Sequence, residues 1–278
     1  MAAQQLSYAA QQVRRYDNDR FLTALFAPAD RREDLLLLYA ANLEIAKSRE
    51  AVSEPLLGRI RLQWWREAIG ELYEGRPRKH EILQPLAETV QRRGLSRLHF
   101  DALIEARETD MEEQPPADEG ALESYAEATS APLVRLALEV LGCAGGTEAA
   151  ATHAGTAYAL AGLLRATAHL AVQRRRALPD ALLAKHGVSE LDLFELRGSA
   201  ALSAATKEVA QAACRHLTLA RGERVPAAAV PALLPARLAE LQLKRLERAG
   251  YDPLAPGVAE PHPLRHVALA WAAARQRF

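Results

Sequence analysis

The sequence predicts an all-α fold, a single-domain bundle of about ten helices that spans residues 1–278. Apolar residues recur at helical spacing along most of the chain, and few segments alternate with the period of two that strands require. Neither an Asn-Gly nor an Asp-Gly dipeptide, the strongest hairpin signals, occurs in the sequence. No polar stretch is long enough to divide the chain, so we expect one domain.

The first predicted helix runs from Asp30 to about Arg49. Asp30 and Glu33 have the spacing of a capping box, which predicts that the helix begins there. Four consecutive leucines at 35–38 leave no polar face. We therefore expect other helices to surround the first half of this helix.

The second predicted helix begins at Ser53 and Pro55 and ends at the turn formed by residues 75–77. Trp64 and Trp65 lie about 100° apart on its surface, so only one of them can face the core. Helical patterns follow over the ranges 80–93, 97–112, 120–141, 147–173, 189–198, 199–220, 226–248 and 263–276.

Composition excludes several classes of protein. The 35 Lys and Arg residues balance 35 Asp and Glu residues, which argues against general nucleic-acid binding. Cys143 and Cys214 are too few for a disulfide framework or a zinc site, and they favour a reducing compartment. The start of the chain lacks the charged and apolar regions of a secretory signal, so we expect a cytoplasmic protein. The excess of 30 Arg over 5 Lys is typical of a GC-rich, bacterial genome.

Four stretches, in order along the chain, carry a resemblance to one family. They are Leu38 to Glu44; Trp64 to Ile69 with Leu72 to Pro77; Gly155 to Tyr158 with Leu163 to Arg165 and Arg176 to Pro179; and Leu246 to Pro253. Together they resemble the squalene and phytoene synthases, which implies the all-α isoprenoid-synthase fold. Members of this family join prenyl diphosphates, and two aspartate-rich motifs on facing helices hold the Mg²⁺ ions that clamp the diphosphate.

The first aspartate motif is degenerate in this chain. Tyr39, Leu43, Ala46 and Glu50 share one stripe of the helix, and the family's aspartate positions fall on Ala46, Lys47 and Glu50. Only Glu50 keeps a carboxylate, and Leu43 stands where the resemblance implies a diphosphate-binding arginine.

The second motif is degenerate as well. Its aligned positions hold Ala166, His169 and Leu170, while Ala159 and Gly162 replace the family's Gln and Asn. No Asp or Glu occurs between Glu148 and Asp180, so this helix offers no carboxylate for magnesium. We therefore predict no catalytic residue and no metal ligand. The remnants of the family's ligand pocket are predicted to be Tyr39, Leu43, Ala46, Lys47, Glu50, Ala159, Gly162, Arg165, Ala166 and His169.

This pattern of losses resembles one branch of the family, the mitochondrial complex I assembly factor related to phytoene synthase and its alphaproteobacterial relatives. The stretches 20–29, 52–54, 61–65 and 187–189 are similar to that branch. The resemblance implies a non-catalytic assembly factor for respiratory NADH:quinone oxidoreductase. Its partner would be a complex I subunit or another assembly factor, and it would need no cofactor.

Two other functions stay open. The chain could be a prenyltransferase, in which case Mg²⁺ would be its cofactor. Alternatively, it could bind an isoprenoid or another lipid without chemistry, because small residues at Ala159, Gly162 and Ala166 could leave an apolar cavity.

Several side chains have two interpretations each. Tyr39 is expected in the core, Arg165 either binds an anion or forms a structural ion pair, and Lys47 with Arg49 either holds a phosphate or is solvated. A metal role for His169 is disfavoured, since no second ligand has the right spacing.

Three surface features are also open to two interpretations. The basic run 174–176 is expected in a solvated loop rather than on a membrane. The acidic residues Glu105, Glu108, Asp110, Glu112 and Glu113 are expected to form a solvated face rather than a magnesium site. The last helix, with Leu264, Val267, Leu269 and Trp271, is expected to dock on the bundle, with peripheral membrane contact as the alternative.

Overall fold

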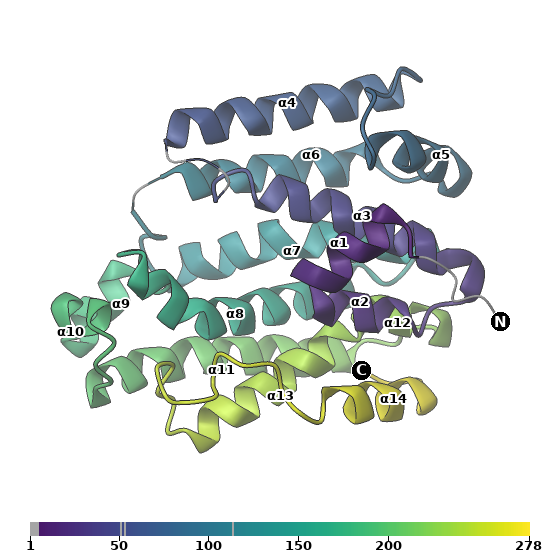
Figure 1. Ribbon diagram of the computed structural model, residues 1–278. Helices are drawn as coiled ribbons and strands as arrows, with labels where there is room; N and C mark the ends of the chain where they lie inside the picture. Colours follow the sequence, from purple (N-terminus) through teal and green to yellow (C-terminus); the bar gives the residue numbers. More distant parts are fainter. Residues whose placement is uncertain (1–5, 51, 53, 113) are drawn as a thin grey trace.

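The computed structural model describes residues 6–50, 52, 54–112 and 114–278, and over these ranges it contains fourteen α-helices and no strand (Figure 1). The all-α prediction is confirmed. The helices are α1 Tyr8–Tyr16, α2 Asn18–Ala24, α3 Ala29–Ala46, α4 Pro55–Tyr73, α5 Leu83–Arg93, α6 Arg97–Ala106, α7 Glu119–Leu141, α8 Glu148–Val172, α9 Asp180–His186, α10 Glu190–Phe194, α11 Ala200–Gly222, α12 Val230–Leu233, α13 Pro235–Arg248 and α14 Arg265–Ala274. Short 3-10 turns occupy Arg107–Met111 and Ala227–Ala229.

The predicted capping box at Asp30 is wrong. Helix α3 begins at Ala29, directly after Pro28, and no side chain caps its first turn. Asp30 lies inside that turn, where its carboxylate contacts Arg31 and Arg93 instead of a backbone N–H. Proline at this position ends the preceding segment and sets the start of the helix without help from a capping oxygen.

Three helices were not predicted, and one predicted helix is divided. Helices α1, α2 and α9 have only seven to nine residues each, too few for a clear period. The predicted helix over 226–248 is broken at Leu234, because Pro235 starts α13. The predicted segment 189–198 is helical only over α10.

Helix α8 lies in the middle of the bundle and packs against α7, α11 and α13 (Figure 1). A Cβ atom added at Gly155 of α8 would lie 2.9 Å from the Cα and N atoms of Ala131 in α7, so the two backbones touch there. The leucines at 35–38 of α3 are all buried, which confirms that other helices surround this segment. None of the helices in the described ranges has the length and apolar character needed to cross a bilayer.

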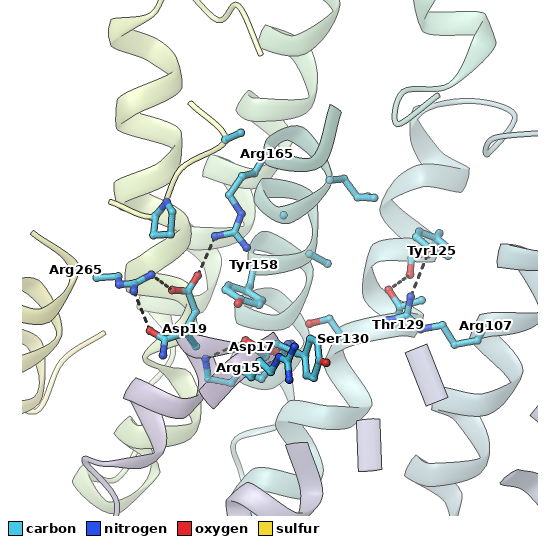
Figure 2. Close-up of a pocket in the computed structure, with 18 residues that line it drawn as sticks. Arg15, Asp17, Asp19, Arg107, Tyr125, Thr129, Ser130, Tyr158, Arg165 and Arg265 are labelled. Atoms are coloured by element: carbon cyan, nitrogen blue, oxygen red, sulfur yellow. Dashed lines mark hydrogen bonds and ion pairs between the residues drawn. The ribbon is translucent and has the colours of Figure 1, made fainter. Parts of the chain in front are cut away.

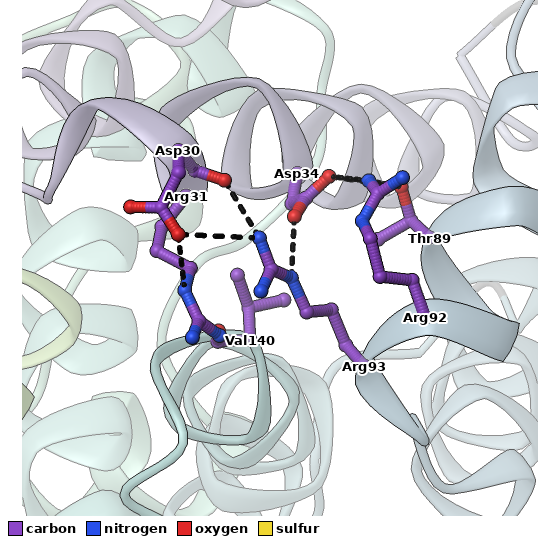
Figure 3. A network of polar contacts seen from close by, with 7 residues as sticks. All are labelled: Asp30, Arg31, Asp34, Thr89, Arg92, Arg93 and Val140. Atoms are coloured by element: carbon purple, nitrogen blue, oxygen red, sulfur yellow. Dashed lines mark hydrogen bonds and ion pairs between the residues drawn. The ribbon is translucent and has the colours of Figure 1, made fainter.

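A buried ion pair ties α3 to α5 (Figure 3). The side chain of Asp34 is only 3% exposed, and it accepts hydrogen bonds from Thr89 Oγ1 at 3.1 Å and from Arg93 Nε at 2.7 Å. Arg92 donates to the same carboxylate. The charge of Asp34 is therefore satisfied by partners from one neighbouring helix.

Candidate functional site

Two adjoining cavities open where α1, α2, α3, α7 and α8 meet. The larger, of about 550 Å³, is lined by Arg15, Arg20, Arg107, Arg165 and Arg265, and we name it the arginine cavity (Figure 2). The smaller, of about 440 Å³, lies between α3 and α8, and we name it the α3–α8 cavity. Tyr16, Arg107, Tyr125 and Leu163 line both cavities, so the two share a wall.

The α3–α8 cavity unites most of the residues predicted from the first aspartate motif. Leu43, Ala46, Lys47 and Glu50 line it from α3 and the turn that follows. Ala166 lines it from α8, which shows that the two degenerate motifs face each other. Gly162 and Ala159, about one and two turns earlier in α8, line the arginine cavity instead, as does Arg165 directly before Ala166.

The α3–α8 cavity does not fit a magnesium–diphosphate clamp. Hard Mg²⁺ needs several carboxylate or carbonyl oxygens in octahedral geometry. Here Lys47 brings a cation to the wall, and Ala46 and Ala166 bring methyl groups. Of the lining carboxylates, Asp110 is already bonded to Tyr125, and Glu50 and Glu112 are the other two. Over the part of the chain that the structure describes, His, Cys, Asp and Glu side chains form no group of three suited to a metal ion.

Arg20 lines the arginine cavity, and its side chain is only 13% exposed. Its Nη1 atom lies 2.6 Å from Asp17 Oδ2, and its guanidinium sits 4.8 Å from the ring centre of Tyr158. Burial opposes the positive charge, but Asp17 and Tyr158 outweigh it and raise the pKa of Arg20. Burial also raises the pKa of Tyr158, so this phenol stays neutral.

Asp19 joins three helices beside the same cavity (Figure 2). Its Oδ2 atom accepts from Arg165 of α8 at 2.9 Å, and its Oδ1 atom accepts from Arg265 of α14 at 3.1 Å. Arg265 also donates to Asn18 Oδ1 at 2.9 Å. Arg165 therefore forms a structural ion pair, one of the two predicted alternatives, although its side chain still lines the cavity.

Two buried polar atoms near the cavities remain unpaired. Arg107 donates to Asp110 and to the hydroxyl of Tyr125, at 3.2 and 3.4 Å, but its Nε atom has no partner among the described atoms. The hydroxyl of Ser130, which also lines the arginine cavity, has none either. Buried donors without partners are costly, so this wall is suited to a polar or anionic ligand.

Two of the predicted pocket residues lie away from both cavities. Tyr39 is 3% exposed and packs in the core, as expected, and burial raises its pKa to about 12. His169 points to the surface and contacts Gln173 Nε2 at 2.9 Å, so its prediction as a pocket remnant is wrong in position. The cavity is lined by Ala166 and Leu170 of α8, whereas the side chain of His169 between them is exposed.

Local contacts bear on three further predictions, which concern Lys47, the basic run 174–176 and the two tryptophans. Lys47 lies 3.5 Å from the ring centre of Tyr16 and 3.8 Å from Glu44, so it is a paired cation at the cavity wall. Arg176 bridges Asp180 and Glu190, which makes part of the basic run structural. Trp65 is buried while Trp64 is 36% exposed, which confirms that only one faces the core.

The acidic cluster does not form a uniformly solvated face. Asp110 bonds Tyr125 and Arg107 at the cavity wall, and Glu108 pairs with Arg66 at 3.3 Å. Glu113 lies outside the described residues. The prediction of a solvated face is therefore wrong for Asp110, because Arg107 and Tyr125 draw it inward.

The charged residues in and between the first two helices were not predicted as site residues. Asp17, Asp19 and Arg20 stand in a short charged run between Tyr16 and Phe21. The signal that could have indicated them is a group of charged residues beside aromatic residues in the first helices of a bundle. Arg265 gave no signal, because its partner Asp19 is 246 residues away in the chain.

The arrangement of helices around a central cavity defines an all-α protein with the fold of the squalene synthases. A squalene synthase from Alicyclobacillus acidocaldarius superposes with a TM-score of 0.78 at 20% identity, covering 88% of this chain and 94% of that one. A dehydrosqualene synthase in complex with ligand superposes with a TM-score of 0.84 at 16% identity, covering 96% and 94%.

The chain belongs to the squalene/phytoene synthase family, whose sequence profile matches residues 13–269. Among its relatives is the rat protein named NADH dehydrogenase (ubiquinone) complex I, assembly factor 6, which is 30% identical over 98% of this chain and 82% of its own. The human protein of the same name is 29% identical over 92% of this chain and 78% of its own. The family resemblance inferred from the sequence is thereby confirmed.

Proposed function

We propose that this protein is a non-catalytic assembly factor for respiratory NADH:quinone oxidoreductase. The supporting observation is that the rat relative named as a complex I assembly factor is 30% identical over 98% of the chain. The lining of the α3–α8 cavity supports the non-catalytic part, because Ala46, Lys47 and Ala166 stand where the family resemblance implies carboxylates and only Glu50 keeps one. A complex I subunit or another assembly factor would be the partner.

Deletion of the gene in its host is expected to lower the amount of assembled NADH:quinone oxidoreductase while leaving succinate dehydrogenase unchanged. Native gels and NADH-dependent quinone reduction in isolated membranes would measure both enzymes. A plasmid copy of the wild-type gene should restore assembly, and a copy carrying Glu50→Gln should restore it equally well, because the last carboxylate of the old motif is not needed. Normal oxidoreductase levels in the deletion strain would contradict the proposal, as would Mg²⁺-dependent turnover of farnesyl or geranylgeranyl diphosphate.

A second function, binding of an anionic lipid without chemistry, is favoured by the arginine cavity. Five arginines line it against two aspartates, and Gly162 and Ala159 leave room beside them. In the described part of the chain, nothing lies within 4 Å of a Cβ atom built at Gly162. A ligand with a phosphate head and an apolar tail would suit this lining.

Native mass spectrometry of the purified protein is expected to show a bound lipid. Gly162→Leu should lose it, because the added side chain would enter the cavity, whereas the smaller Gly162→Ala should retain it. Both variants should keep the wild-type helical content in circular dichroism. A lipid-free wild-type protein, or equal retention in Gly162→Leu, would count against the lipid-binding function.

We also place the protein in the bacterial cytoplasm, with access to the inner membrane face. The excess of arginine over lysine and the free thiols of Cys143 and Cys214 support this placement. Fractionation of the native host would test it.

A further inference from the structure

Helix α14 has two apolar faces, and only one of them packs against the bundle. Leu269 and Ala272 are buried, and Leu269 packs with Val230, Leu234 and Leu238 of the neighbouring helices. On the outer face, Leu264, Val267 and Trp271 are 61%, 68% and 58% exposed. These three residues, spaced by three and four positions, form what we call the outer stripe. Helix α14 itself lies at the edge of the molecule in Figure 1.

The surroundings of the outer stripe are positively charged. Residues 261–278 include three arginines and two histidines but no Asp or Glu, in a chain whose total charge is balanced. His266, Arg275 and Arg277 are exposed. The guanidinium of Arg275 lies 4.3 Å from the ring centre of Trp271, which places a cation directly beside the most apolar part of the stripe.

The orientation of α14 is fixed by contacts at both ends. Arg265, at its start, is held by Asp19 and Asn18 of α2. Beyond its end, the backbone oxygen of Phe278 accepts a hydrogen bond from Arg221 of α11 at 3.0 Å. Because both ends are tied to the body of the protein, the helix cannot roll to bury the stripe, and the stripe stays directed outward.

From these observations we propose that the outer stripe binds the surface of an anionic lipid bilayer. Leu264, Val267 and Trp271 enter the boundary between headgroups and acyl chains, and Arg275 with Arg277 contacts lipid phosphates. An apolar face with tryptophan, rimmed by arginine and free of acids, is the pattern of helices that lie in a membrane interface. Binding to lipid does not require complex I. A negative result for lipid binding would therefore leave the proposed assembly function standing, and a positive result would not establish it.

Helix α4 provides a matched comparison. It also exposes apolar residues, namely Leu56, Leu57, Ile60 and Trp64, and Arg59 is exposed among them. It differs from α14 in carrying two acids, Glu67 and Glu71, in its second half. In Figure 1, α4 lies at the opposite edge of the bundle from α14. A single flat bilayer that contacts α14 therefore leaves α4 in water.

Sedimentation with vesicles tests the proposal. The wild-type chain is expected to bind vesicles of phosphatidylglycerol mixed with phosphatidylcholine more tightly than vesicles of phosphatidylcholine alone. The double variant Val267→Ser/Trp271→Ser should bind the anionic vesicles at least about tenfold more weakly. Arg275→Glu/Arg277→Glu should weaken binding by about tenfold or more and abolish the preference for phosphatidylglycerol. The control Leu57→Ser/Ile60→Ser should bind as the wild type does, and thermal melting should show that all variants fold.

Fluorescence identifies the residue that enters the lipid. Vesicles with brominated acyl chains are expected to quench the wild-type tryptophan emission, and Trp271→Phe should remove this quenching while vesicle binding persists. Absence of wild-type binding to the anionic vesicles would overturn the proposal. Equal losses in the α14 and α4 variants, or unchanged quenching in Trp271→Phe, would overturn it as well.

Discussion

Replacing Asp34 by alanine is expected to lower the free energy of unfolding by about 3–5 kcal/mol. The substitution removes a carboxylate that is 3% exposed and accepts from three side chains of α5. It leaves the guanidinium of Arg93, itself only 12% exposed, without its closest carboxylate. The loss of one member of a buried pair costs more than the pair contributes, because the remaining charge stays out of water. Urea denaturation followed by circular dichroism would measure the change.

Asp30 is the matched control, because it also contacts Arg93. Its side chain is 67% exposed, and the ion pair spans 3.7 Å. Asp30→Ala should therefore change stability by no more than about 1 kcal/mol. Similar losses for the two variants would show that burial of Asp34 does not determine the strength of this contact.

Gly155→Ala is expected to destabilise the protein by about 1–3 kcal/mol. The new methyl group would lie 2.9 Å from the backbone of Ala131, so α7 and α8 would have to separate at the centre of the bundle. Alanine is a better helix former than glycine by about 1 kcal/mol, so helix propensity alone would predict that the variant is more stable than the wild type. A thermal unfolding midpoint below that of the wild type would show that close packing dominates.

Gly162→Ala, two turns later on the same helix, should raise stability by about 0.5–1 kcal/mol. Its Cβ atom meets nothing within 4 Å in the described ranges, so only the gain in helix propensity remains. The two variants carry the same chemical change, and their opposite signs would separate packing from propensity. If both stabilise the protein, the contact between α7 and α8 is looser than the structure has it.

The long helices could be predicted because their signals are local. Helices α4, α7 and α8 have strong apolar periods and clear breaks, and their predicted bounds differ from the structure by one or two residues. Helix α1 is capped by Ser7, but its buried face consists of Ala9, Ala10 and Val13, which hardly differ from a polar loop in composition. Short helices of this kind are held by tertiary packing rather than by their own sequence.

The candidate site could be predicted only where one helix supplies several residues. The stripe from Leu43 to Glu50 faces Ala166 because spacing along α3 and α8 fixes which side chains share a face. The arginine cavity joins residues from α1, α2, α7, α8 and the C-terminal region. Their convergence depends on how the helices are arranged, which no local pattern in the chain encodes.

The ion pairs of Asp19 also set an order of events during synthesis. The ribosome adds Arg265 as the 246th residue after Asp19, a delay of roughly 12–50 s at about 5–20 residues per second. Until then the growing chain holds an aspartate that only Arg165 can neutralise. The wall of the arginine cavity is consequently completed only after Arg265 has been added, so a nascent chain that ends before Arg265 cannot yet present the finished ligand site.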